Sequence, residues 1–405
     1  MEFSNIKSNF PIFNQKINGR PLIYLDSANS SQKPRTVIDE ISRFYENEFS
    51  NVGRSVHTLA VKATNKFEET RDIIQSYINA KYREEIIFTK GATEAINLVA
   101  HTYGEKFIKE GDEILITELE HHSNYVPWHY LRKKRGAVIK FASVNENGEI
   151  DVDEFKKQIS EKTKIIAFTH ISNVTGTIMP VKKIIDLAKS KNIPVLIDGT
   201  QGAPHSILDV QDLGCDFYAI SCHKMYGPNG LGILYAKKKW IDELPPYQGG
   251  GGMISEVKKE EITYADSPTK FEAGTMQTAE VIAFSKSIKF IQDLGIRNIE
   301  NHETQILEYG LEKLRKDNSI KIIGNPKNRA SIISFTMKGI HPHDIATILD
   351  DDGVAIRAGH HCCQILHDKL GIPASARASI GVYNNKEDID VLSESINKCK
   401  KIFQI

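Results

Sequence analysis

The fold is decided by two stretches of sequence, Val195-Leu196-Ile197-Asp198-Gly199-Thr200-Gln201 and Phe217-Tyr218-Ala219-Ile220-Ser221-Cys222-His223-Lys224. Each begins with a short apolar run typical of a buried strand and ends in polar residues. The ends of neighbouring strands meet at one edge of an open α/β sheet, where such sheets bind ligands. We therefore expect Asp198 and Lys224 to lie close together. A lysine amine can form a Schiff base with an aldehyde cofactor, and an aspartate can keep a pyridine nitrogen protonated.

Each of these two residues has an ordinary explanation when it is taken alone. A lysine that follows a strand is most often a solvated surface residue, and an aspartate there usually caps a turn or a helix. The pair gains its meaning from its spacing and from the motifs that accompany it.

The composition excludes several classes of protein. The chain has 405 residues, of which 40% are hydrophobic and 26% charged, as in a soluble globular protein. Its 52 Lys and Arg residues balance 52 Asp and Glu residues, which argues against bulk binding of nucleic acid or membrane. No apolar run reaches the ~18 residues of a membrane span and no signal-peptide pattern is seen, so we expect a cytoplasmic protein. Five cysteines do not form a disulfide framework, so we expect reduced thiols.

Strand-like and helix-like segments alternate through the first 240 residues, which indicates an α/β fold with a mainly parallel sheet covered on both faces. From the apolar spacing we predict helices over 92–107, 126–135, 181–190 and 278–294, strands over 85–88, 114–116, 138–141, 165–169 and 195–197, and a hairpin or loop over 254–270. From about Ile296 the pattern becomes that of a smaller α+β domain, with a strand over 331–335. We therefore expect a large domain over 25–290 and a small domain built from 1–24 and 291–405.

A phosphate site is predicted at the run Thr89-Lys90-Gly91-Ala92-Thr93-Glu94, which lies between an expected strand and an expected helix. The first turn of a helix offers free N–H groups and the positive end of a dipole, and small residues let an anion approach the backbone. Taken alone, the run is better explained as an ordinary helix start. Beside a Schiff-base lysine, it favours a ligand that carries a phosphate.

Two further motifs place polar side chains after expected strands. The imidazole of His121 could lie over a cofactor ring and relay protons, although a surface loop histidine fits the sequence as well. Adjacent His121 and His122 point apart and have no cysteine pair nearby, so no zinc site is predicted. Asn173 could donate to a cofactor or substrate, or it could serve the turn before Gly176.

A second centre is predicted at Arg357-Ala358-Gly359-His360-His361-Cys362-Cys363, in the expected small domain. Its polar flanks indicate an exposed loop, where a nearby cation or imidazole lowers the pKa of a thiol and yields a nucleophilic thiolate. A buried structural cysteine is the usual alternative, and four consecutive residues rarely bind one metal ion, so no metal is predicted. Arg377, set among small residues, could bind a carboxylate through two N–H groups or form a surface salt bridge.

Taken together, these residues resemble the class V branch of the fold-type-I enzymes that depend on pyridoxal 5'-phosphate (PLP), and more narrowly the SufS-type cysteine desulfurases. The resemblance extends nearly from end to end. The matching stretches are Tyr24–Ala28, Arg54–Leu59, Glu120–Asn124, Val126–Trp128, His170–Gly176, Asp198–Gln201, Ser221–Pro228, Phe271–Thr275, Arg357–Cys362 and Arg377–Ser379. The fold that it implies is an α/β fold-type-I PLP-dependent transferase, with a mainly parallel seven-stranded sheet in the large domain and a smaller α+β C-terminal domain.

The resemblance also implies a role for each matching residue. Lys224 would carry PLP, Asp198 would pair with the pyridine nitrogen, His121 would stack on the ring, and Cys362 would be the nucleophile. Thr275 would reach the phosphate of the other subunit, which implies a homodimer. The implied site residues are Lys224, Cys362 and His121 for catalysis, Thr93, His121, Asp198, Gln201, Ser221, His223, Lys224 and Thr275 for the cofactor, and Asn173, Arg357 and Arg377 for the substrate.

Four positions depart from the pattern of these enzymes. Ala92 replaces a threonine, so a backbone N–H must serve the phosphate there, and Gly53 stands where a histidine is frequent. Cys222 replaces a glycine inside the lysine motif. Cys363 replaces an alanine, and it could accept sulfur from Cys362 or trap an inactive species.

The implied activity is the conversion of L-cysteine to L-alanine, with a persulfide left on Cys362 for an acceptor in iron–sulfur cluster assembly. The run His341-Pro342-His343-Asp344 resembles enzymes served by a zinc-containing SufU-type acceptor, which we favour over a SufE-type acceptor; a plain helix start explains it nearly as well. The alternatives are a selenocysteine lyase, another class V enzyme such as an aminotransferase or a kynureninase-like hydrolase, and a catalytically silent scaffold that binds a sulfur-transfer partner.

Overall fold

The structure, a computed structural model, describes residues 3–53 and 55–405, so Arg54 of the matching stretch Arg54–Leu59 lies outside the described residues. Its centre is a seven-stranded sheet in the order β4-β10-β9-β8-β7-β5-β6. Strands β5 to β9 are parallel, whereas β10 runs antiparallel to both of its neighbours. The strands are β4 (Ile86–Thr89), β5 (Glu113–Thr117), β6 (Val138–Ala142), β7 (Thr163–Thr169), β8 (Val195–Asp198), β9 (Phe217–Ser221) and β10 (Gly232–Ala236).

Helices cover both faces of this sheet because successive apolar residues of each strand enter opposite cores. In β7, for example, Ile166 packs into one core and Ala167 into the other. Residues of α2 (Thr58–Tyr77), α5 (Val152–Gln158), α6 (Val181–Lys189), α7 (Val210–Leu213) and α9 (Thr278–Leu294) contribute to the first core, and residues of α3 (Ala92–Phe107), α4 (Val126–Arg135) and α8 (Lys238–Glu243) contribute to the second. The predicted helices over 92–107, 126–135 and 278–294 are confirmed.

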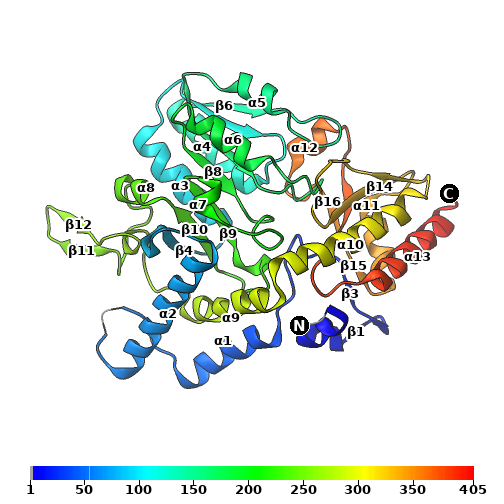
Figure 1. Ribbon diagram of the computed structural model, residues 1–405, viewed down its shortest axis with the longest axis horizontal. Coiled ribbons are helices and arrows are strands. Elements are labelled where there is room, and N and C mark those ends of the chain that lie inside the picture. Colours follow the sequence, from blue (N-terminus) through cyan, green and yellow to red (C-terminus); the bar gives the residue numbers. More distant parts are fainter. Residues whose placement is uncertain (1–2, 54) are drawn as a thin grey trace.

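The C-terminal region forms a layer of strands and a layer of helices around its own apolar core (right in Figure 1). This core includes Leu314, Phe335 and Leu392. A four-stranded antiparallel sheet of order β13-β14-β17-β16 packs there against three helices. These elements are β13 (Ile320–Ile322), β14 (Ile332–Met337), β16 (Arg357–Gly359) and β17 (Ser375–Ser379), with α10 (Ile296–Arg315), α11 (Pro342–Asp351) and α13 (Lys386–Phe403).

The N-terminal segment crosses to this second region. β3 (Ile23–Tyr24) pairs in parallel with β15 (Val354–Ala355), next to the small sheet. This pairing supports the expected division, and we propose that 25–290 form the large domain and that 1–24 with 291–405 form the small one. Because α9 continues to Leu294, we move the proposed junction on the C-terminal side from residue 290 to Gly295.

Further elements surround these two regions. α1 (Arg35–Asn47) packs on α9, and α12 (Gln364–Lys369) follows the cysteine loop. The predicted hairpin is confirmed as β11 (Ile254–Val257) and β12 (Ile262–Tyr264), which project from the large domain in Figure 1. Among the described helices, none is both long and apolar enough to cross a membrane.

Candidate active site

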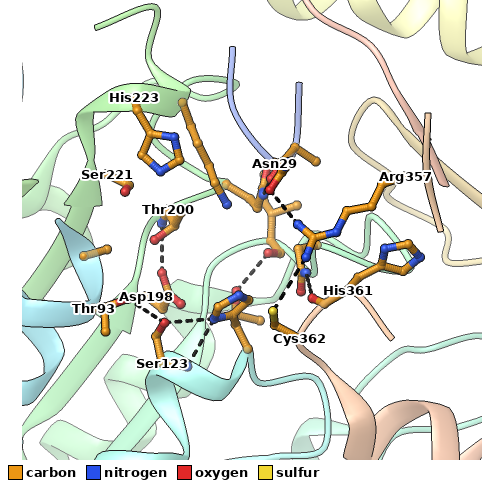
Figure 2. A pocket seen from close by; sticks show the side chains of 18 of the residues that line it. Asn29, Thr93, Ser123, Asp198, Thr200, Ser221, His223, Arg357, His361 and Cys362 are labelled. Carbon is orange, nitrogen blue, oxygen red and sulfur yellow. Dashed lines mark hydrogen bonds between the residues drawn. The ribbon is translucent and has the colours of Figure 1, made fainter. Parts of the chain in front are cut away.

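A cavity of about 230 Å³ lies at the ends of β7, β8 and β9, and it is lined by residues of the central sheet and of the C-terminal region (Figure 2). Eleven of the twelve residues predicted for the site line it. These are Thr93, His121, Asn173, Asp198, Gln201, Ser221, His223, Lys224, Arg357, Cys362 and Arg377. The exception is Thr275, which lies on an exposed loop outside the cavity, so its role toward a second subunit stays a prediction.

Asp198 is the last residue of β8 and is 4% exposed. Its carboxylate Oδ1 accepts a hydrogen bond of 3.0 Å from the backbone N–H of Thr200, which fixes the side chain at the strand end. The next residue must be small, because a Cβ at Gly199 would meet the Tyr218 ring at 1.8 Å. A buried carboxylate is thereby held in a single place.

Lys224 ends a short 3-10 helix, Cys222–Lys224, that follows β9. Since β8 and β9 are neighbouring parallel strands, this turn brings the amine to the same edge of the sheet as Asp198. Burial, and secondarily the Arg377 guanidinium, lowers the pKa of the Lys224 amine to about 8, while Asp198 opposes the shift. The amine is therefore far more available as a base or nucleophile than an ordinary lysine.

His121 stands beside these groups in a defined tautomer. Its Nδ1 accepts the backbone N–H of Ser123 at 3.1 Å and lies 2.9 Å from the Ser123 hydroxyl, which in turn lies 2.8 Å from Oγ1 of Thr93. We infer that the neutral ring carries its proton on Nε2. Burial, followed by the charge of Lys224, lowers the pKa of His121 to about 3, so the imidazole is neutral at physiological pH.

The end of the cavity nearest α3 is suited to an anion. Thr93 lies in the first turn of this helix, after Gly91 at the N-cap, so N–H groups and the positive end of the helix dipole face this end. Strand β10 approaches closely, because a Cβ at Gly232 would meet the backbone of Gly91 at 2.4 Å. Ser221 and His223 line the same end from β9 and its turn.

Cys362 enters the cavity from the C-terminal region, after β16. Its Sγ lies 3.7 Å from Nη2 of Arg357, whose Nη1 donates to Oδ1 of Asn29 at 2.5 Å. Figure 2 shows the Arg357 guanidinium between Asn29 and Cys362. The sulfur therefore has a cation beside it, and that cation is itself held by a side chain of the large domain.

The loop around Cys362 is bound to the large domain through two carbonyl groups. The carbonyl of Cys362 accepts the backbone N–H of His122 at 2.8 Å, and the carbonyl of His361 accepts Nδ2 of Asn173 at 2.7 Å. His361 and Cys362 have φ angles of 51° and 56°, a left-handed conformation that side chains rarely adopt. The loop is thus a strained segment held by contacts between the domains.

The adjacent cysteine has a different environment. Cys363 is fully buried, and its thiol donates to the carbonyl of Leu119 at 3.4 Å. Burial, followed by the charge of Glu120, raises the pKa of the Cys363 thiol well above its ordinary value. Cys362 lines the cavity and Cys363 does not, so the geometry distinguishes two residues that the sequence leaves side by side.

Several buried polar groups at the cavity lack a partner. Arg377 is fully buried and donates to the carbonyl of Asn173 at 3.0 Å and to Asp26 at 3.1 Å, yet its Nε has no partner among the described residues. Gln201 donates from Nε2 to the carbonyl of Ala28 at 2.6 Å, and its Oε1 is likewise unpaired within the described chain. Unpaired buried polar atoms around a cavity indicate a polar ligand.

Sequence reasoning assigned no role to other residues at this site. The cavity is also lined by Asn29, Ser123, Thr200 and His361. Of these, Ser123 could have been predicted from the sequence, because it stands two residues after His121. Below them, the buried Glu120 accepts from Asn124 at 2.6 Å and from the backbone of Thr169 at 3.1 Å, which ties the histidine loop to β7. Burial raises the pKa of Glu120 to about 8.

The comparisons with known proteins agree with this geometry. Residues 23–392 match the model of the family described as aminotransferase class-V. The chain belongs to the class-V aminotransferase family. This class-V chain is 47% identical over 403 residues to a probable cysteine desulfurase of Halalkalibacterium halodurans, with 100% of this chain and 99% of that protein covered. A probable cysteine desulfurase of Staphylococcus epidermidis is 47% identical over 395 residues, covering 97% and 96% of the two chains.

Solved structures of cysteine desulfurases are similar to this chain over nearly its whole length. The crystal structure of the Escherichia coli cysteine desulfurase CsdA, in an S-sulfonic acid form, has a TM-score of 0.92 and 33% identity, and covers 100% of this chain and 99% of that one. The apo structure of a cysteine desulfurase from Thermococcus onnurineus has a TM-score of 0.93 and 34% identity, with 98% of each chain covered. The expected fold-type-I architecture is confirmed.

The cofactor of this class-V protein is PLP, and the cavity has the groups that PLP requires. The Lys224 amine suits its aldehyde, the buried Asp198 carboxylate suits its ring nitrogen, and the N-terminus of α3 suits its phosphate. The unpaired atoms of Gln201 and Arg377 are further places for polar contacts.

Proposed function

We propose that the protein is a SufS-type cysteine desulfurase, which converts L-cysteine to L-alanine and leaves a persulfide on Cys362 for iron–sulfur cluster assembly. The observation that carries the proposal is that Lys224 and Cys362 line one cavity from opposite domains. One residue serves chemistry at the α-carbon of an amino acid, and the other can attack a sulfur atom.

PLP bound through Lys224 would supply an electron sink for the α-carbon of the substrate. Asp198 would hold the ring nitrogen protonated, and Thr93, Ser221 and His223 would bind the phosphate. The neutral ring of His121 would lie on the cofactor ring, and its Nε2–H would be available for proton transfer. The amide group of Gln201 has a second hydrogen beyond the one given to Ala28, and we assign that hydrogen to the ring oxygen.

Lys224 would then remove the α-proton of the substrate, a task that suits an amine whose pKa is lowered to about 8. Arg377 and Asn173 would hold the substrate carboxylate, since the Nε–H of Arg377 has no partner among the described residues. The charge of Arg357, 3.7 Å from Sγ, would stabilise negative charge on Cys362.

Sulfur transfer follows from the position of Cys362. Its thiolate attacks Sγ of the substrate, a new S–S bond forms, and the Cβ–Sγ bond breaks. The electron pair of that bond stays with Cβ, which takes up a proton and becomes the methyl group of alanine. The Cys362 thiol and one L-cysteine are consumed, and one persulfide and one L-alanine are formed.

A SufU-type acceptor for this persulfide is supported by His341 and His343. Both side chains are exposed, and their rings stack at 5.3 Å with an angle of 8° at the start of α11. Nδ1 of His341 accepts the N–H of His343 at 3.3 Å and caps the helix, which leaves Nε2 of His341 and the whole ring of His343 for a zinc-bearing partner. Full acceptor-stimulated turnover in both His341→Ala and His343→Ala would end this assignment.

The function is tested by recording the visible spectrum before and after adding L-cysteine, with alanine and sulfide assayed in the wild type and Cys362→Ser. We expect a yellow protein whose band shifts with cysteine, and sulfide formation that depends on Cys362. Activity without Cys362 would point to a lyase or transaminase relative. A colourless protein would contradict the enzyme and favour a catalytically silent scaffold that binds a sulfur-transfer partner. We further propose a cytoplasmic homodimer in which Thr275 serves the phosphate of the other subunit, to be checked by sedimentation and by the PLP content of Thr275→Ala.

A further inference from the structure

Lys33 is a half-buried lysine for which the reaction described above has no use. Its amine donates to the carbonyl of His223 at 2.8 Å and to the carbonyl of Ser31, and lies 3.5 Å from Oγ of Ser30. Within the described chain, no carboxylate lies at ion-pair distance from it. Burial lowers the pKa of Lys33 to about 8, which reflects the cost of an ammonium group without a counter-charge. Because this half-buried cation is costly and its amine contacts the residue directly before Lys224, its presence calls for an explanation.

The carbonyl of His223 is the centre of this arrangement. It accepts from the backbone N–H of Ser31 at 3.1 Å, from the Ser31 hydroxyl at 3.0 Å, and from Lys33 at 2.8 Å. The Ser31 oxygen meanwhile accepts the N–H of Tyr226 at 2.7 Å, so its own hydrogen is directed to the carbonyl. A carbonyl oxygen has two lone pairs, and three donors saturate it. The residue directly before Lys224 is thereby fixed.

Ser30 connects the same lysine to the His223 ring. Its Oγ lies 3.1 Å from Nδ1 of His223, and its hydroxyl is also within donor distance of the His223 carbonyl, at 3.3 Å. Three other donors already occupy that carbonyl and Lys33 approaches the Ser30 oxygen at 3.5 Å, so we assign the serine hydrogen to Nδ1, the shorter of its two contacts. Nδ1 is then an acceptor. Burial, followed by the charge of Lys224, lowers the pKa of His223 to about 4, so the ring is neutral and carries its proton on Nε2.

We propose that Lys33 is a positioning residue for the phosphate of the cofactor, acting through His223. It holds the turn that carries Lys224 by the His223 carbonyl, and through Ser30 it selects the His223 tautomer that donates from Nε2 at the phosphate end of the cavity. Lys33 does not itself line the cavity. The inference rests on the phosphate role proposed above for His223.

The first test is Lys33→Met in the full-length protein, with the dissociation constant of PLP measured by absorption titration. Removing one partner of a buried hydrogen-bonded group predicts binding about tenfold weaker. ¹⁵N NMR of histidine-labelled holoenzyme, with the His223 signal assigned by its loss in His223→Gln, should show protonated Nε2 in the wild type and a mixture in Lys33→Met. The ³¹P shift of bound PLP should change with it. Lys33→Arg should restore most of the PLP affinity and of the protonated Nε2 signal. Lys182→Met removes an exposed charge elsewhere, and it should change neither the PLP affinity nor the His223 tautomer.

Ser30→Ala tests the same route if Lys33→Met does not fold. It should also weaken PLP binding and release the His223 tautomer, and the double variant should be no weaker than the worse single variant, because both act through one ring. Wild-type PLP affinity and protonated Nε2 in either variant would overturn the role of Lys33. A protein that binds no PLP, or that keeps its absorption band in Lys224→Ala, would instead overturn the proposed function.

Discussion

The two sides of the cavity are built in different ways. On the lysine side, Asp198 ends β8 and Lys224 follows the neighbouring β9, so the sheet itself sets their positions. On the cysteine side, Cys362 lies three residues beyond β16, and two hydrogen bonds from the large domain hold its left-handed backbone. The lysine side is a rigid centre suited to chemistry at one carbon atom, whereas the cysteine side is a loop whose position depends on contacts with residues of the central sheet region.

The strongest test of the rigid side is Lys224→Ala. It removes both the cofactor link and the base, so alanine formation should fall by about 1,000-fold or more. The protein should remain folded, because the sheet does not depend on this amine. Alanine released from L-cysteine is the measurement, with Lys182→Ala as the control. If Lys224→Ala kept more than a tenth of the activity, the lysine side would not be the catalytic centre.

The next test uses the charge of the same lysine in the cofactor-free protein. Its folded pKa of about 8 lies below the ordinary lysine value, so between about pH 8 and 10.5 the unfolded chain binds more protons and the unfolding free energy rises with pH. Below pH 8 the folded protein holds the buried ammonium group of Lys224, which lowers the unfolding free energy by about 3 kcal/mol at most.

Lys224→Met removes this cost. The variant should therefore be more stable than the wild type at pH 7, and the gap should close toward pH 10.5. Urea unfolding at four pH values measures both curves. Parallel curves would contradict the burial of a charge on the rigid side.

The two adjacent cysteines sharpen the comparison. Cys363→Ser places a hydroxyl in a fully buried position, so we expect a loss of about 1–2 kcal/mol in the unfolding free energy with persulfide formation intact. Cys399→Ser, at another buried thiol, serves as the stability control. Loss of sulfur transfer at unchanged stability would instead make Cys363 part of the route for sulfur.

The smallest effect is expected from the loop anchor. Asn173→Ala removes the hydrogen bond to the His361 carbonyl, and with it about 1 kcal/mol of docking. Hydrogen exchange over residues 357–363 should become roughly fivefold faster. The value of kcat/KM should fall by at least the same factor, because Asn173 is also assigned to the substrate carboxylate. Exposed Asn318→Ala is the matched control. Exchange unchanged in Asn173→Ala would show that the loop is held by other contacts.

The lysine side could be predicted from the sequence because it follows from local pattern. The apolar spacing of 92–107 gave α3 with its bounds, and the polar residues after β8 and β9 gave Asp198 and Lys224. The antiparallel β10 was not assigned, because a short apolar run does not state its direction or its neighbours. The roles of Lys33, Ser30 and Asp26 could not be predicted either. They depend on contacts with residues nearly 200 or more positions away, and such contacts produce no periodic pattern in the sequence.

The left-handed backbone of the cysteine loop has a consequence for how sulfur leaves the enzyme. Two non-glycine residues with φ near 50–60° each cost about 1 kcal/mol, and two neutral hydrogen bonds return about as much. The docked conformer of the loop is therefore favoured over an undocked conformer by less than its contacts alone would give. An acceptor protein that prefers the undocked conformer by about 1.4 kcal/mol then shifts their ratio by a factor of ten, without any change at Lys224.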